Sequence, residues 1–243
     1  MQIAPPPARL SLFTALSGIR AAWFSVFAYV LFGTYIGIGA LAHDFGFSLF
    51  WVMLSTELIW AGPAQVILIS ALGAGAAPFE AAIAVGLSGV RLLPMVVTLL
   101  PVIRTPDTRL ASLLLPTHFT AASMWIESMR LVPQLPREQR VAFCTGLGAG
   151  YMISALIATA AGFYLAAKLP ALLTAGLLFL TPMSFLVSAA RGAHYLVDRL
   201  ALALGLMIGP LLAYLAIDLD IMWTGIAGGT LAYLVHRIRE SAA

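Results

Sequence analysis

Charged residues, cysteine and asparagine are scarce in this sequence. Of its 243 residues only 9% are charged, one is a cysteine (Cys144) and none is an asparagine. A single cysteine excludes an internal disulfide and a cysteine-based metal site. P-loop and dinucleotide-binding motifs are also missing, because the glycines lie in apolar runs without the strand and helix context that those motifs need. We therefore expect no nucleotide, metal or other cofactor.

Apolar residues, in contrast, dominate the chain. Hydrophobic residues make up 61% of it, and the mean hydropathy is +0.99. Both the high apolar share and the low charge lie outside the range of ordinary soluble domains. Apolar runs of about 20 residues recur, which is the length that a helix needs to cross the hydrocarbon layer. These features predict an all-α, polytopic membrane protein in contact with the lipid bilayer, and the net charge of +3 indicates no nucleic-acid partner.

We predict seven to eight transmembrane helices in a single transmembrane domain that covers residues 1–243. The spans are expected near residues 22–42, 47–72, 79–101, 109–129, 141–166, 171–189, 197–217 and 221–236. The fourth span is the weakest, because threonine, serine, histidine and glutamate dilute its apolarity. If it does not cross fully, seven spans result and the C-terminus moves to the other side.

The basic residues predict how the chain lies in the membrane. With a cytoplasmic N-terminus, nine arginines fall on the cytoplasmic side and three basic residues outside, as the positive-inside rule favours. We expect a multi-pass protein of the cell inner (cytoplasmic) membrane. Residues 1–21 form a leader in which Leu12, Phe13, Leu16 and Ile19 would share one side of a helix. This pattern is typical of a short helix in the headgroup region, and a solvated leader is the alternative.

The segment 47–72 carries an acid and a helix break inside an apolar run. Glu57 precedes Ala61-Gly62-Pro63-Ala64, and Gln65 follows directly. Lipid offers no partner for a carboxylate or for freed backbone groups, so both must face protein or a water-filled cavity. Pro63 should open the helix around residues 60–64, and the new helix start near Gln65 would present N–H groups to a substrate carboxylate. A simple proline kink is the alternative.

Three further polar side chains lie within predicted spans. Arg91 is placed deep in the third span, where a guanidinium needs an acidic or carbonyl partner, and Glu57 is the candidate. An ion pair without substrate contact is the alternative. His118, next to Thr117, could pass a proton near neutral pH, although a histidine that only packs would look the same in sequence.

An internal repeat is suggested by glycines and prolines. The first span contains Gly33, Gly37 and Gly39 and precedes the break at Pro63. The fifth span contains Gly146, Gly148 and Gly150 and precedes an expected break at Pro182. Repeats with interrupted helices in matching positions are typical of transporters, and chance similarity between apolar helices is the alternative.

Several short runs resemble the AzlC family of branched-chain amino-acid exporters. They are Gly33-Thr34-Tyr35-Ile36-Gly37-Ile38-Gly39-Ala40-Leu41-Ala42, Gly46-Phe47-Ser48, Ala61-Gly62-Pro63-Ala64-Gln65, and Gly176-Leu177-Leu178-Phe179 with Pro182. Arg91 falls where the family has an Asn-x-Arg-His motif, with Gly89 and Leu92 in place of the asparagine and histidine. Thr117-His118 stands where an Asp-Glu pair is common. The resemblance implies a transporter scaffold and a small AzlD-type membrane subunit in a hetero-oligomer.

Together, the residues and the resemblance predict a secondary active transporter and not an enzyme. It would export branched-chain or similar apolar amino acids, coupled to protons through Glu57 and His118. The expected substrate-binding residues are Tyr35, Glu57, Trp60, Gly62, Pro63, Gln65, Arg91, Thr117 and His118. Transport of another small amphiphile and a non-transporting scaffold subunit are the alternatives. A lipid-acting membrane enzyme would need a denser cluster of acids and histidines than His43-Asp44 or 218–220 provides.

Overall fold

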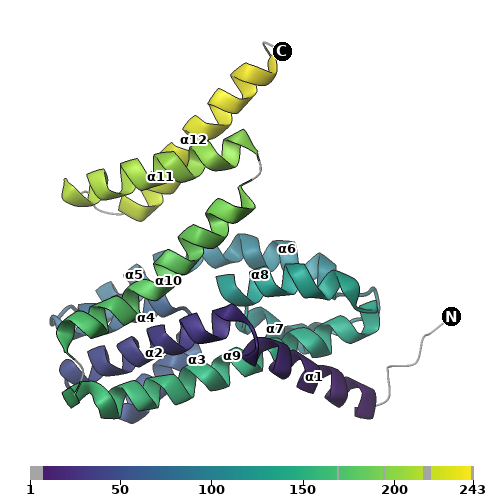
Figure 1. The fold of residues 1–243 in the computed structure, drawn as a ribbon, viewed down its shortest axis with the longest axis horizontal. Helices are drawn as coiled ribbons and strands as arrows, with labels where there is room; N and C mark the ends of the chain where they lie inside the picture. The colour runs from purple at the N-terminus through teal and green to yellow at the C-terminus, as the bar shows by residue number, and fades with distance from the viewer. Residues whose placement is uncertain (1–7, 169, 194, 216–219, 242–243) are drawn as a thin grey trace. The chain divides into compact units, whose positions relative to one another are not determined.

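The computed structural model describes residues 8–168, 170–193, 195–215 and 220–241, and within these ranges it contains helices and no strand (Figure 1). The helices are α1 (Ala8–Trp23), α2 (Val26–Asp44), α3 (Leu49–Ile59), α4 (Gly62–Gly73), α5 (Pro78–Gly89), η1 (Val90–Leu92), α6 (Leu93–Ile103), α7 (Leu110–His118), α8 (Ala122–Leu131), η2 (Val132–Gln134), α9 (Arg137–Leu165), η3 (Ala166–Lys168), α10 (Ala171–Gly192), α11 (Leu196–Tyr214) and α12 (Asp220–Ser241). The predicted all-α class is confirmed.

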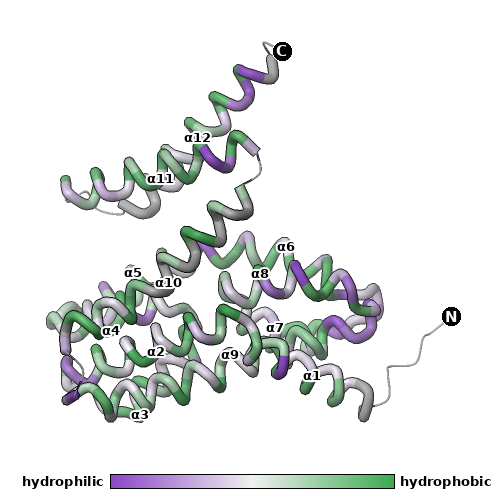
Figure 2. Tube along the Cα trace, viewed as in Figure 1, coloured by the Kyte–Doolittle hydropathy of each residue, from purple (hydrophilic) through white to green (hydrophobic). Residues whose placement is uncertain are grey.

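Four helical segments of the described chain are long and apolar enough to cross a membrane. They are α2, the continuous run of α5, η1 and α6 (Pro78–Ile103), α9 and α11. They coincide with the spans expected at 22–42, 79–101, 141–166 and 197–217. Hydrophobic residues cover most of their length (Figure 2). The chain is a polytopic helical membrane protein. Helices α10 and α12 occupy the positions of the spans expected at 171–189 and 221–236, whose crossing stays a prediction.

The chain divides into two compact units, Met1–Thr181 and Pro182–Ala243. The first unit is built around α9, its longest helix, along which α1 and α2 pack. Close approach is possible because glycines face backbone across both contacts. A Cβ at Gly39 of α2 would collide with the Thr159 carbonyl oxygen, and one at Gly162 of α9 would collide with the Ile36 carbonyl oxygen. Small residues at helix contacts are a common device of membrane proteins, where packing replaces the hydrophobic drive.

Helix α2 is capped by Ser25, which also connects it to α9. The Ser25 hydroxyl oxygen accepts a hydrogen bond from the Ala28 N–H (3.3 Å) and lies 2.7 Å from the Tyr151 hydroxyl. Such a cap satisfies one of the free N–H groups at a helix start. On α1, Leu12, Phe13 and Leu16 are exposed, which leaves an apolar face of the leader uncovered. Whether this face lies in the headgroup region stays a prediction.

The predicted single span at 47–72 is wrong, because the chain folds back at the break. The Gln65 amide nitrogen donates to the Val52 carbonyl oxygen (3.4 Å), although 13 residues separate them. In one continuous helix these residues would lie about 20 Å apart along the axis. Helices α3 and α4 therefore lie beside each other. Each is about 16–18 Å long, too short to cross a hydrocarbon layer of about 30 Å.

The segment expected to cross at 109–129 is also interrupted. It consists of the short helices α7 and α8, which are separated by Phe119, Thr120 and Ala121. Neither has the length of a span. Its predicted weakness thus corresponds to a break in the helix, and the first unit contains two pairs of short helices.

The expected break at Pro182 is wrong, because α10 continues through this position from Ala171 to Gly192. The suggested internal repeat loses one of its two matching breaks and otherwise stays a prediction. In the second unit, α11 and α12 pack against each other. Gly209 lies beside Thr224 and Gly228 beside Leu204, so the two helices run antiparallel.

Candidate functional site

The break between α3 and α4 is formed by two residues, Trp60 and Ala61. Trp60 adopts a left-handed conformation (φ 43°, ψ 39°), and its N–H donates to the Thr56 carbonyl oxygen (3.2 Å). Ala61 is extended, and α4 resumes at Gly62 with Pro63 in its first turn. Proline is tolerated there because that position has no intrahelical partner for an N–H group. The predicted opening of the helix is confirmed, and it is confined to Trp60 and Ala61.

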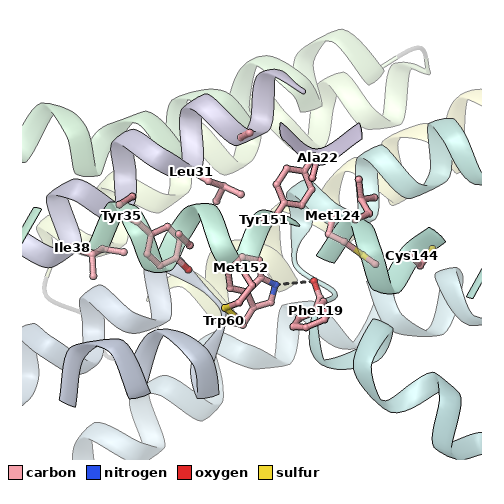
Figure 3. Packing of buried hydrophobic residues seen from close by; sticks show 14 of the residues in the cluster. Ala22, Leu31, Tyr35, Ile38, Trp60, Phe119, Met124, Cys144, Tyr151 and Met152 are labelled. Atoms are coloured by element: carbon pink, nitrogen blue, oxygen red, sulfur yellow. Dashed lines mark hydrogen bonds between the residues drawn. The ribbon is translucent and has the colours of Figure 1, made fainter. Parts of the chain in front are cut away.

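A left-handed tryptophan is strained, so neighbouring groups must hold it in place. Trp60 is almost fully buried, and its ring stacks on Tyr35 of α2 with 6.1 Å between centroids and 15° between planes. Its indole N–H donates to the Phe119 carbonyl oxygen at 2.8 Å. Figure 3 shows this bond, with Tyr35 on the other side of Trp60 and Met152 of α9 close by. The ring is thus fixed by groups from α2, α9 and the α7–α8 break.

The two breaks are joined by a reciprocal pair of hydrogen bonds. Trp60, at the end of α3, reaches the carbonyl oxygen of Phe119, which follows α7. His118, the last residue of α7, places its Nε2 atom 2.8 Å from the carbonyl oxygen of Glu57 on α3. Since carbonyl groups at helix ends lack intrahelical partners, each break supplies a side chain that satisfies the other. The bond to an acceptor assigns the proton to Nε2 of His118.

A buried polar cluster adjoins the first break. The Gln65 amide nitrogen lies 2.7 Å from Thr56 Oγ1 and 3.0 Å from Ser55 Oγ, and Thr56 Oγ1 lies 3.5 Å from Thr159 Oγ1 of α9. All four side chains are buried. The Gln65 carbonyl oxygen Oε1, also buried, has no hydrogen-bond partner among the described residues.

The first turn of α4 adds unpaired backbone donors. Its cap residue, Ala61, cannot bond the turn through its side chain. The N–H groups of Gly62 and Ala64 meet no acceptor within the described part of the chain, and the first backbone bond is that of Gln65 to the Ala61 carbonyl oxygen (2.9 Å). Ala61, Gly62, Ala64 and Gln65 are all buried. Such donors carry partial positive charge and suit an anionic group.

Two buried or intramembrane acids differ in their surroundings. Glu127 on α8 is buried and forms an ion pair with Arg130, whose Nε lies 3.2 Å from Glu127 Oε2. The bond and charge of Glu127 raise the pKa of Arg130 above its ordinary value. The Glu57 carboxylate is partly exposed and makes no hydrogen bond or ion pair with the residues that the structure describes. Of the two acids, only Glu127 has a charged partner among the described residues.

The structure brings together eight of the nine predicted site residues. Those at or next to the two breaks are Tyr35, Glu57, Trp60, Gly62, Pro63, Gln65, Thr117 and His118. Arg91 is the exception: it lies in η1, is exposed, and has no ion pair or hydrogen bond within the described ranges. The expected pairing of Arg91 with Glu57 is not formed. The described residues also contain no group of three metal-ligating side chains.

Several residues of this region were not predicted from the sequence. They are Ser55, Thr56, Phe119 and Thr159, all buried. Ser55 and Thr56 directly precede Glu57, so a polar pair next to an intramembrane acid was a usable signal. Phe119 takes part through its backbone, and Thr159 through the position of α9, neither of which a residue type reveals.

The family model described as AzlC protein matches residues 25–169, more than half of the chain. The chain belongs to the AzlC family, which comprises membrane transporters of the amino-acid exporter kind. The matched segment runs from the start of α2 to the end of η3 and contains both breaks. No curated protein and no solved structure shows a significant match to the chain.

Proposed function

We propose that this chain is the large subunit of a secondary active exporter of branched-chain or similar apolar amino acids. It is driven by the proton gradient, lies in the inner membrane with a cytoplasmic N-terminus, and acts with a small AzlD-type subunit. The observation that carries the proposal is the meeting of two interrupted helices at Trp60 and Phe119 in a chain of this family. Interrupted helices that meet inside the bilayer are where transporters bind substrates and ions.

The groups at the two breaks have complementary tasks in this proposal. The free N–H groups at the start of α4 take the substrate carboxylate, and they replace Arg91 in that role because Arg91 makes no hydrogen bond or ion pair with the other described site residues. Glu57 takes the ammonium group or the coupling proton. Thr117 and His118 complete the polar wall, with His118 as a second proton carrier. Tyr35 and Trp60 border the pocket for the apolar side chain.

Loss of the Glu57 charge is expected to stop coupled export. Cells loaded with dipeptides of valine, leucine, isoleucine or methionine should release the amino acid when the chain and its small partner are expressed. Efflux should collapse with an uncoupler and fall at least about tenfold in Glu57→Gln, since general acid–base groups of this kind contribute that much or more. Glu80→Gln is the matched control, because Glu80 is exposed and a glutamine can still accept from the Ala77 N–H.

Export that continues at the wild-type rate in Glu57→Gln would contradict the assignment of the coupling site. If the chain and its partner are well expressed and no efflux occurs, the proposal that the chain exports amino acids would be contradicted. A different amphiphile as substrate would then be found by a broader ligand screen, and a scaffold subunit would bind none.

Arg91 is the residue through which we expect the partner to act. It is exposed at the middle of the Pro78–Ile103 span, nearly all of which is unburied. A guanidinium at this depth needs an acidic or carbonyl group, and an added subunit can supply it. Arg91→Ala should leave the melting temperature of the isolated chain within about 2 °C, but reduce recovery of the small subunit in tagged purification and efflux with it. Arg104→Ala, an exposed arginine after α6, is the control. Equal recovery from both variants would contradict this role.

A further inference from the structure

The carbonyl oxygen of Gln65 is a buried acceptor without a donor. Gln65 has no exposed surface, and its Oε1 atom has no hydrogen-bond partner among the described residues. An acceptor in this state is unfavourable in any protein interior, and lipid cannot supply a donor either. A group that donates to this oxygen when it binds would remove the penalty.

The hydrogen bonds around Gln65 determine which way its amide points. The hydroxyl groups of Ser55 and Thr56 both donate to the Val52 carbonyl oxygen, at 2.9 and 3.0 Å. With their protons used in this way, the two hydroxyl oxygens can only accept from Gln65, at 3.0 and 2.7 Å. The amide therefore presents its NH₂ group to α3, and Oε1 is the atom left for a ligand.

Gln65 belongs to the same helix turn as the free donors. Gln65 is the fourth residue of α4, and side chains of a helix lean toward its N-terminus. The side chain therefore starts beside the first turn, whose Gly62 and Ala64 N–H groups meet no acceptor in the described structure, and its amide nitrogen reaches α3. One turn of helix thus offers donors for an anion and an acceptor for a cation. An amino acid fits both, because its α-carbon bears an ammonium group and a carboxylate group.

We propose that Gln65 Oε1 accepts a hydrogen bond from the α-ammonium group of the exported amino acid, while the first turn of α4 holds its carboxylate. This inference rests on the proposed function, because the ligand is the exported substrate. It assigns the ammonium to a neutral oxygen and so leaves Glu57 free to carry the coupling proton.

The test compares leucine with two analogues that each lack one charge. Isocaproate is leucine without its amino group, and isoamylamine is leucine without its carboxylate. Dissociation constants are measured by calorimetry, and melting temperatures are recorded on the purified full chain with its partner subunit. Wild type should bind leucine about 10- to 100-fold more tightly than isocaproate, as expected for a buried hydrogen bond to a charged group.

In Gln65→Leu the advantage of leucine over isocaproate should disappear, while affinity for isocaproate stays within about threefold of wild type. The variant should fold, because it removes an unpaired polar atom and leaves the Ser55 and Thr56 donors bonded to Val52. Gln65→Glu provides a second variant of nearly equal size, in which the advantage of leucine should persist or grow. Ser128→Ala, a buried hydroxyl on α8 that contacts Met124 and Cys144, is the control.

Three results would overturn the inference while leaving the proposed function in place. In the first, Gln65→Leu keeps the wild-type preference for leucine over isocaproate. In the second, it loses discrimination against isoamylamine instead, which would assign Gln65 to the carboxylate. In the third, sodium chloride but not choline chloride stabilises the wild type without an amino acid, and Gln65→Leu abolishes this effect. Failure of every amino acid to bind the wild type would instead overturn the proposed function.

Discussion

Replacing Trp60 by alanine is expected to lower the free energy of unfolding by about 3–5 kcal/mol, as for other buried aromatic residues, and to abolish efflux. The indole fills the space between Tyr35 and the α7–α8 break and satisfies the carbonyl oxygen of Phe119. Without it, the two interrupted helices lose one of the two bonds that join their breaks. The measurement is a thermal melt of the purified protein, paired with the dipeptide-loaded efflux assay.

Trp60→Phe separates the hydrogen bond from the ring. Phenylalanine can still stack on Tyr35 but leaves the Phe119 carbonyl oxygen without a donor, which should cost about 1–3 kcal/mol. Trp125→Phe is the matched control, because Trp125 also donates its indole N–H, to Thr98 Oγ1 at 2.9 Å, but at an exposed site. We expect the control to change stability by no more than about 0.5 kcal/mol. Equal effects of the two phenylalanine variants would show that the bond between the breaks has no special weight.

The second large effect is expected where α2 and α9 touch through glycine. Gly39→Ala places a methyl group against the Thr159 carbonyl oxygen, and Gly162→Ala places one against that of Ile36. Backbone cannot move aside as a flexible side chain can, so each substitution should cost about 1–3 kcal/mol through overpacking. Because Thr159 also belongs to the Gln65 cluster, Gly39→Ala should weaken leucine binding as well as stability. Melting temperature and leucine affinity are the measurements.

Gly86→Ala tests whether the effect comes from packing and not from the loss of glycine itself. A Cβ at Gly86 of α5 would meet nothing within 4 Å. Alanine is the better helix former, so this variant should be neutral or more stable by up to about 1 kcal/mol. In the double variant Gly39→Ala/Gly162→Ala, the loss of stability should be smaller than the sum of the two single losses, because one outward shift of α2 relieves both collisions. A destabilised Gly86→Ala would contradict the packing argument.

Comparison of the two breaks explains why the site could be predicted only in part. The break at Trp60 was readable because proline next to an acid in an apolar run has few structural explanations. The break after α7 consists of Phe119, Thr120 and Ala121; Pro116 lies within α7, and no acid directly precedes this break as Glu57 precedes the first. That the two breaks meet depends on hydrogen bonds between residues some sixty positions apart, which no local pattern contains.

For Arg91, in contrast, the sequence predicted a contact that the structure does not form. Its residue type and its depth in an apolar span led to the prediction that it needs a partner, and Glu57 was the candidate acid. The structure forms no ion pair between the two: Glu57 lies on the short helix α3, and Arg91 lies exposed in η1, within the long Pro78–Ile103 span. The sequence indicates that a charged residue in a span needs a partner, but it does not indicate which residue or subunit that partner is.

The sequence by itself determined the class of the protein, the positions of the long apolar helices, the family and the place where α3 ends. These follow from composition, from runs of membrane length and from proline chemistry, all of which act locally along the chain. Only the tertiary structure decided that 47–72 turns back instead of crossing, that α10 continues through Pro182, and that the amide of Gln65 is left with a free oxygen. Length and apolarity permit a crossing, but the partners that buried polar groups find across the fold determine which path the chain takes.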